Sequence, residues 1–337
     1  MKIRGIIFSR SEKSYLFYSR QAGLLSTVIL YSARKMIITF LWLIIHISLS
    51  AQVSPVTNQY VLNPMTINPA YAGNRGVLNI AAFYRRQWVG IAKAPETITL
   101  AMDLPVISSK LGLGLVFTNN KYGVTREMQY SSNYAFKIDT RKGSLSFGLG
   151  AGLLTTNTAW SDLKVLDPGD ETYLTNSRVY IVPAFSFGVY YARQRYFLGI
   201  SIPKLLGYTF DVNRNKYAPD FNPGQYNYLL YTGYVFNLSP RLAFFPSTLV
   251  TYSHGENILY DINGHFILFD RIWLGVSYRN DRSVGGLIQL GLNNQLKLAY
   301  TYDFDFGSLR SYSSGSHELM LRYEFRYKVK VVNPLIF

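Results

Sequence analysis

The feature that most constrains this chain is a long series of short segments in which large apolar residues alternate with small or polar ones. A period of two is typical of β-strands, because successive side chains of a strand point to opposite faces. After residue 51 no apolar run approaches the roughly 18 residues of a transmembrane helix. We therefore expect an all-β chain of about fourteen strands, in the segments 77–85, 97–104, 111–118, 128–138, 144–153, 179–191, 196–202, 226–237, 241–252, 258–268, 272–278, 284–292, 296–302 and 319–325.

The two faces of these segments decide what kind of β protein to expect. In one segment Leu111, Leu113 and Leu115 alternate with Gly112 and Gly114. A β-sandwich would turn the apolar face inward, but its water-facing strands would usually carry more Lys and Glu than glycine. Charged residues make up only 16% of the chain, equal to the aromatic share. The pattern favours an antiparallel transmembrane β-barrel of the outer-membrane type over 77–326, whose glycines suit a crowded interior.

The connections between segments differ in length. Those at 140–143, 192–195 and 280–283 are short enough for hairpin turns, whereas 155–178, 204–225 and 303–316 are long. Outer-membrane barrels have short periplasmic turns and longer outer loops, so this imperfect alternation supports the barrel.

The first 51 residues read as an export signal. Arg34 and Lys35 precede an apolar run that starts at Met36 and ends in small residues. We expect a signal peptide over 1–51 with cleavage after Ala51, cleavage after Ser50 being the alternative. Met36 would itself serve as a start, in which case 1–35 is an over-extension of the reading frame. A retained signal anchor is the competing interpretation.

Residues 52–76 do not share the strand pattern. They contain two Asx-Pro turn signals five residues apart and then a glycine-rich stretch, which predict a folded, turn-rich periplasmic segment. The residues that carry these signals are Asn63, Pro64, Asn68, Pro69, Tyr71, Gly73 and Gly76.

Catalytic and metal-binding motifs are not found in the sequence. The chain has no cysteine, and His254, His265 and His317 stand apart from one another. We therefore expect no enzymatic activity, no cofactor and no metal. Carboxylates of an outer loop, Asp162, Asp167, Asp170 and Glu171, could ligate calcium. Within them Asp167-Pro168-Gly169-Asp170 is also an ordinary turn, which is the interpretation we favour.

Two further sets of residues allow more than one interpretation. Arg85, Arg86 and Trp88 end the first strand, where they would either anchor the barrel at the membrane interface or form a contact patch for a partner. The formal net charge is +15, but the basic residues after residue 51 are scattered singly along the chain. A nucleic-acid site would cluster them on one element, so we expect no nucleic-acid binding.

Several stretches together resemble the PorP/SprF family. They are QYVLNPMTINPAYAGNRG, YRRQWVGI, APETITLAMDLPV, GLGL, LKVLDPGDETY and GSHELMLRYEF, spread in order over about 52–325. Members of that family are outer-membrane barrels of the type IX secretion system of Bacteroidota, some of them linked to gliding motility. This chain departs from the pattern in its first 35 residues and in a tail at 327–337. The machinery that inserts barrels into the outer membrane recognises an aromatic residue at the end of the last strand, and here either Phe325 or Phe337 would serve.

The resemblance implies a non-enzymatic role in exporting proteins with C-terminal sorting domains or in holding them at the surface. Implied partners are outer-membrane lipids, periplasmic ring or lipoprotein subunits of the secretion system, and a secreted cargo protein. We expect a docking platform, with the turn-rich segment folded into or under the barrel as its main partner contact. A diffusion channel or transporter of hydrophobic solutes is the alternative.

Overall fold

The computed structural model describes residues 58–106, 110–163, 175–211 and 216–325. The expected signal peptide, the tail at 327–337 and the loop motif at 167–170 lie outside the described residues. Within them, no helix is long and apolar enough to cross a membrane.

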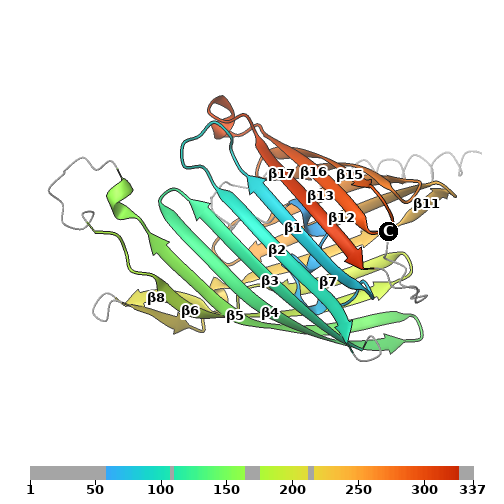
Figure 1. Cartoon of the computed structure of the whole chain (residues 1–337), viewed down its shortest axis with the longest axis horizontal. Helices are drawn as coiled ribbons and strands as arrows, with labels where there is room; N and C mark the ends of the chain where they lie inside the picture. The colour runs from blue at the N-terminus through green and yellow to red at the C-terminus, as the bar shows by residue number, and fades with distance from the viewer. Residues whose placement is uncertain (1–57, 107–109, 164–174, 212–215, 326–337) are drawn as a thin grey trace, which may run out of the picture. The chain divides into compact units, whose positions relative to one another are not determined.

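Most of the described chain is β-strand (Figure 1). The strands are β1 (Leu78–Arg86), β2 (Glu96–Val106), β3 (Leu111–Tyr122), β4 (Thr125–Thr140), β5 (Gly143–Thr158), β6 (Tyr180–Arg193), β7 (Tyr196–Ile202), β8 (Gly207–Asp211), β9 (Lys216–Asp220), β10 (Asn227–Tyr234), β11 (Phe236–Ser239), β12 (Leu242–Ser253), β13 (Leu259–Leu268), β14 (Ile272–Arg279), β15 (Ser283–Gly291), β16 (Leu296–Asp305) and β17 (Ser316–Phe325). Single 3₁₀ turns lie in the connections, namely η4 (Trp160–Asp162), η6 (Pro223–Gln225) and η7 (Ser308–Ser311).

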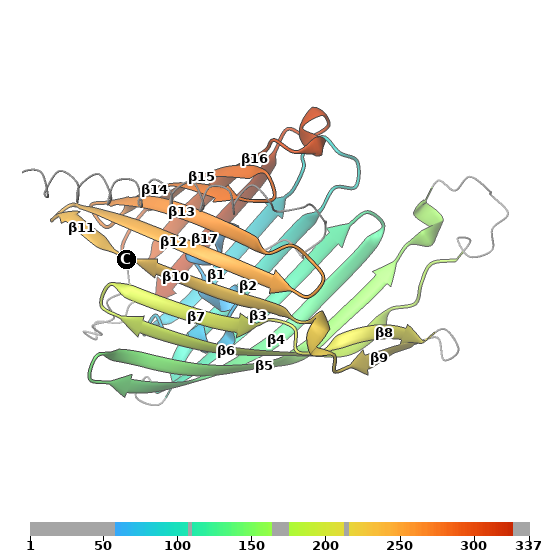
Figure 2. The ribbon, with the colours of Figure 1, turned by 180° about the vertical axis from the view of Figure 1, so that it is seen from behind.

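The sheet closes on itself into a barrel. Consecutive strands pair antiparallel from β1 to β7 and from β11 to β17, β10 pairs with β7 and with β12, and β1 pairs with β17. Within the described residues the closed ring has 14 strands, with β11 continuing beside β12 where β10 ends (Figures 1 and 2). The expected barrel and strand number are confirmed, and every one of the fourteen predicted segments corresponds to a strand of the ring.

Side-chain exposure alternates around the ring as the period of two predicts. Leu113 and Leu115 of β3 are 38% and 51% exposed, whereas Gly112 and Gly114 between them are buried. A β-sandwich would bury such leucines between two sheets. Here the apolar face points outward from a single closed sheet, which is the arrangement of a transmembrane barrel.

The two ends of the barrel differ in their connections. At one end, which we call the short-loop end, the six connections after β2, β4, β6, β11, β13 and β15 have two to four residues. At the other, the long-loop end, they range from the two-residue turn Gly123–Val124 to the long stretch between β7 and β10. The tight turns after β3 and β14 lie at the long-loop end, which explains why the alternation looked imperfect in the sequence.

The connection between β7 and β10 contains a hairpin that the sequence analysis treated as loop. Strands β8 and β9 pair with each other over five residues each and form a separate two-stranded sheet. The Tyr217 ring of β9 meets the Tyr180 ring of β6 edge to face, with centroids 5.1 Å apart. Strands this short have too few alternating positions to stand out in the sequence.

The segment before β1 folds into the barrel lumen. It forms three 3₁₀ turns, η1 (Asn58–Val61), η2 (Pro64–Thr66) and η3 (Pro69–Tyr71), drawn in blue inside the barrel in Figure 2. Each proline occupies the first position of its turn, where a missing N–H costs nothing. Asn68 caps η3, since its Oδ1 accepts a hydrogen bond from Ala70 N at 2.9 Å. Sequence analysis predicted turns here and allowed a place in or under the barrel; these residues lie within it.

Candidate functional site

Residues 58–76, which we call the plug, are the candidate functional site. Asn63, Asn68 and Ala70 have no exposed surface, and Tyr71 is 4% exposed. Of the predicted partner-contact residues, Asn63, Pro64, Asn68, Pro69 and Tyr71 are thus brought together in the lumen, and Gly73 and Gly76 follow them at the junction with β1. Both glycines have positive φ, of 68° and 73°, a conformation that other residues rarely adopt.

Glycines of the barrel wall make room for the plug. A Cβ on Gly148 of β5 would collide with the backbone of Ala70, and one on Gly188 of β6 would collide with the Asn68 side chain. On β3 a Cβ on Gly112 would collide with the carbonyl of Ala72. The inward glycines of these strands therefore fit the plug backbone, which gives a specific reason for the small-residue face.

Asn68 fixes the plug to one side of the wall. Its Nδ2 donates hydrogen bonds to the carbonyl oxygens of Val189 in β6, at 3.1 Å, and Ile200 in β7, at 3.2 Å. Its Oδ1 is occupied by the cap of η3, so the amide uses both of its ends. A buried amide that is this fully bonded specifies one position for the segment.

Other plug residues bond to the opposite side of the wall. Gln59 Nε2 donates to Thr301 Oγ1 of β16 and to the Glu318 carbonyl of β17, both at 3.1 Å. The Tyr60 hydroxyl accepts a hydrogen bond from Asn263 Nδ2 of β13 at 2.8 Å. Burial raises the pKa of Tyr60 well above its usual value, and the nearby charge of Asp261 adds to this. The plug is therefore held between opposite walls.

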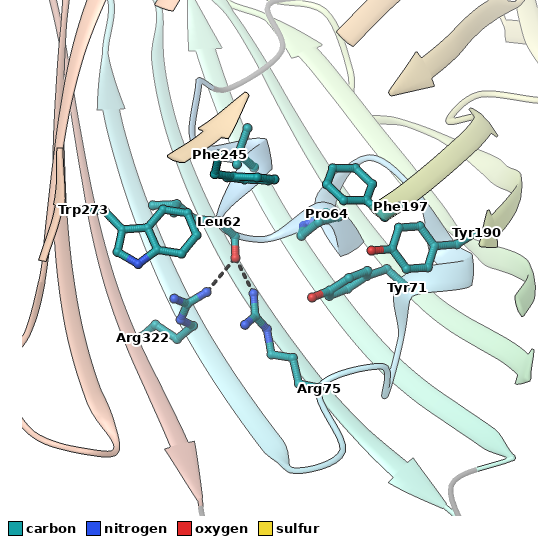
Figure 3. A pocket seen from close by; sticks show the side chains of 10 residues that line it. Leu62, Pro64, Tyr71, Arg75, Tyr190, Phe197, Phe245, Trp273 and Arg322 are labelled. Carbon is teal, nitrogen blue, oxygen red and sulfur yellow. Dashed lines mark hydrogen bonds between the residues drawn. The ribbon is translucent and has the colours of Figure 1, made fainter. Parts of the chain in front are cut away.

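Three cations surround one carboxylate where the plug joins β1. Glu324 Oε1 lies 3.2 Å from Lys297 Nζ and 3.5 Å from both Arg75 Nη1 and Arg322 Nε. The two arginines also donate to a single carbonyl of the plug, that of Leu62, as Figure 3 shows. Because all these side chains are buried, each charge depends on the others to offset the cost of leaving water.

A second ion-pair cluster contains one residue of the predicted contact patch. Arg85 Nη1 lies 3.0 Å from Asp303 and 2.9 Å from Glu318, and its side chain is buried. Arg86 is exposed on the other face of β1. Trp88 is half-buried in the β1–β2 connection, where its backbone N–H donates a hydrogen bond to Ser316 Oγ. The structure thus separates the three residues, with Arg85 in the lumen and Arg86 outside.

A small cavity lies beside the plug. Its volume is about 50 Å³, far below the roughly 300–1,000 Å³ typical of small-molecule sites. It is lined by plug residues, the two arginines and a set of aromatic rings, namely Val61, Leu62, Pro64, Tyr71, Arg75, Tyr190, Phe197, Phe245, Trp273 and Arg322 (Figure 3). A cavity of this size holds no substrate-sized molecule while the plug is in place.

Catalytic or metal-binding geometry is not found among the described residues. His265 is buried in the lumen, whereas His254 is exposed in a loop. Asp162 lies 3.6 Å from Lys93, and no group of three His, Asp or Glu side chains in the described ranges could hold a metal ion.

Sequence reasoning missed most of the charged residues that hold the plug. Glu318, Arg322 and Glu324 lie at alternate positions of β17, all on the inward face. The available signal was that all three charges fall on even-numbered positions of the strand, whereas leucines occupy positions 319 and 321 between them. What it would bond to was not readable, since the partners lie on other strands and on the plug.

Comparison with known proteins identifies one family for most of the chain. A family model described as "Type IX secretion system membrane protein PorP/SprF" matches residues 49–323. No curated protein matches the chain.

Among solved structures, Omp33 of Acinetobacter baumannii aligns with 74% of this chain and 98% of its own, at 9% identity and a TM-score of 0.45. The CymD monoaromatic hydrocarbon channel aligns with 82% of this chain and 95% of its own, at 11% identity and a TM-score of 0.49. A Pseudomonas aeruginosa FadL homologue aligns with 77% of this chain and 93% of its own, at 12% identity and a TM-score of 0.39.

Proposed function

The chain belongs to the PorP/SprF family of type IX secretion system membrane proteins, and on that basis we propose that it is a non-enzymatic docking component of this system in the outer membrane. It assists the export or surface attachment of cargo proteins with C-terminal sorting domains, adhesins for gliding motility being one candidate cargo. The family match supports membership in the secretion system; the docking role is our inference from the plug.

The observation that carries the docking role is the filled lumen. The plug forms hydrogen bonds to β2, β6, β7, β13, β16 and β17. Glycines of the wall leave the space that its backbone occupies. A channel for diffusing solutes needs a continuous open path, which this packing obstructs. A platform needs only a rigid barrel that presents its ends to partners.

The short-loop end is the end that we assign to the periplasm, because outer-membrane barrels have their short turns there. The plug joins β1 at this end, at Gly73 to Gly76. Periplasmic ring or lipoprotein subunits of the secretion system would then meet the junction between plug and barrel, and cargo would meet the long loops outside.

Deletion of residues 53–76 tests the role of the plug. We expect the barrel to assemble, as judged by its heat-dependent shift on gels, while export of a reporter carrying a C-terminal sorting domain is lost. Leu149→Ala, 60% exposed on the outer face of β5, is the control that keeps export. Normal export by the deleted chain would refute the role of the plug in docking.

The alternative, a diffusion channel, is tested by conductance in planar lipid bilayers. A plugged adaptor gives few and small openings, whereas the 53–76 deletion gives large steady ones. Large steady openings of the intact chain would favour the channel instead.

A further inference from the structure

The two ends of the barrel differ in charge as well as in loop length. Among the described residues, the connections and strand ends at the short-loop end carry seven exposed cationic side chains and two exposed carboxylates, Asp139 and Asp270. The cations are Lys110, Arg141, Lys142, Arg193, Arg195, Arg241 and Arg271, which we call the basic rim. Among the described residues of the long-loop end, nine exposed cations stand among seven carboxylates that are exposed or half-buried, as where Lys93 lies 3.6 Å from Asp162. The excess of positive charge is therefore larger at the short-loop end, where fewer carboxylates accompany the cations.

The basic rim runs around the barrel instead of forming a patch on one side. Its members follow β2, β4, β6, β11 and β13, which is every described short connection except the one after β15. Consecutive connections at this end are separated by a full hairpin, so the cations are spaced along the circumference. A single docked protein would contact one sector, whereas lipids surround the whole wall.

Aromatic rings place the basic rim at the membrane interface. Tyr191 and Tyr196, whose ring centroids are 6.5 Å apart, lie within two residues of Arg193 and Arg195. The Arg241 guanidinium of the β11–β12 turn lies 6.0 Å from the centre of the Phe269 ring, which belongs to the β13–β14 turn and is 57% exposed. Amphipathic and aromatic rings of this kind gather at the headgroup level of a bilayer. The short turns keep the cations at that level.

From this charge, spacing and depth we propose that the basic rim binds the phosphate groups of anionic phospholipid headgroups. Arginine and lysine at a membrane surface are attracted to anionic lipids, and the attraction is screened by salt. Binding around the whole rim would hold the short-loop end, and with it the plug junction, at a fixed depth in its leaflet. Lipid preference can be measured without any secretion partner, so it stands or falls separately from the docking role.

The test uses the full mature chain in proteoliposomes with spin-labelled lipids, whose immobilised fraction reports the lipids that contact the barrel. We expect phosphatidylglycerol to associate about fivefold more strongly than phosphatidylcholine at low salt. The preference should fall towards unity in about 1 M NaCl, where the Debye length is about 3 Å.

A variant and a matched control locate the effect. The rim variant changes the six members of the basic rim other than Lys110 to glutamine. The control changes six cations of the long-loop end, namely Arg86, Lys93, Lys121, Lys216, Arg282 and Arg310. The rim variant should lose most of the preference and the control little. The pair Arg141→Gln and Lys142→Gln alone, on one exposed turn, should lose a part of it and guards against misassembly of the larger variant.

Equal association of the two lipids, or a preference that survives in the rim variant, would overturn the proposal. Poly-L-glutamate added to the protein in phosphatidylcholine nanodiscs provides the competing arm. If it binds through the rim while phosphatidylglycerol shows no preference, the rim is a surface for an acidic protein and not for lipid.

Discussion

The outer surface and the lumen of this barrel are made by the same strands and obey different rules. Outside, Leu319 and Leu321 of β17 stand about half exposed, and any large apolar side chain would serve the lipid equally well. Inside, the neighbouring Met320 and Arg322 are buried, and Arg322 donates hydrogen bonds to Gln289 of β15 and to Leu62 of the plug. The comparison teaches that the outer residues determine only that the barrel faces lipid, whereas the inner residues determine which groups meet in the lumen.

The largest effect should come from filling a place that the lumen reserves for the plug. In Gly148→Val the new side chain occupies the position of Ala70, so we expect the plug to be displaced and the conductance in planar bilayers to change from rare openings to large steady ones. Gly286→Val is the control, because a Cβ on Gly286 meets no atom within 4 Å. If both variants conduct alike, the tight fit between wall and plug does not keep the lumen closed.

Removing a lumen charge should be the next largest effect. Glu324→Gln leaves Arg75, Lys297 and Arg322 without their shared carboxylate, which should lower the free energy of unfolding by about 3–5 kcal/mol. The measurement is urea unfolding of the refolded barrel in lipid vesicles. Asp270→Asn, an exposed carboxylate of the short-loop end, should change it by less than about 0.5 kcal/mol. Similar values for the two variants would show that the buried cluster contributes no specific stability.

Adjacent residues of β17 give the most direct comparison of the two faces. Met320→Ala should lower the free energy of unfolding by about 2–5 kcal/mol, because the side chain has no exposed surface and a cavity would remain on the inner face of the barrel. Leu319→Ala, at 45% exposure on the outer face, should cost about 1 kcal/mol or less, since lipid chains fill the space. The same unfolding assay compares them, and an equal or larger loss in Leu319→Ala would contradict the difference between the faces.

The smallest expected effect is a loosening of the plug at alkaline pH. Burial raises the pKa of Tyr60 and Tyr71 above that of an unfolded chain, about 10. The two neutral rings therefore stabilise the seated plug fully below pH 10. This stabilisation is lost as the pH rises through their raised pKa values. Openings in planar bilayers should be unchanged between pH 8 and pH 10, and should become more frequent above pH 10, less so in Tyr71→Phe. Openings that do not increase above pH 10 would mean that these two rings do not make the seating of the plug depend on pH.

Much of the barrel wall could be predicted from the sequence. The alternation depends only on residues two apart, so β7 at 196–202 was located to the residue and the closed ring has the expected number of strands. The β8–β9 hairpin was missed, because five-residue strands contain little periodic signal. Val235 separates β10 from β11, where a single strand was expected at 226–237. No turn-forming residue at this position indicates the break in the sequence.

The candidate site was predictable in part. Asx-Pro turns are local signals, and in the structure a 3₁₀ turn begins at each of the two prolines. Its anchors were not predictable, because Gln59 bonds to residues 242 and 259 positions away and Asn68 to residues 121 and 132 away. The charges on β17 were visible as residues but not as a network.

The sequence by itself determined the wall of the barrel. Residues two apart share a face of a strand, so the alternation of apolar and small residues is sufficient to assign lipid-facing and lumen-facing positions. What only the tertiary structure decided is which distant groups meet. Closing β1 onto β17 brings Arg85 to Glu318, and folding the plug inward brings Leu62 to Arg75 and Arg322. The basic rim is the same lesson on a larger scale. Its cations are scattered singly along the chain, and they gather because hairpin after hairpin returns the chain to one end of the barrel.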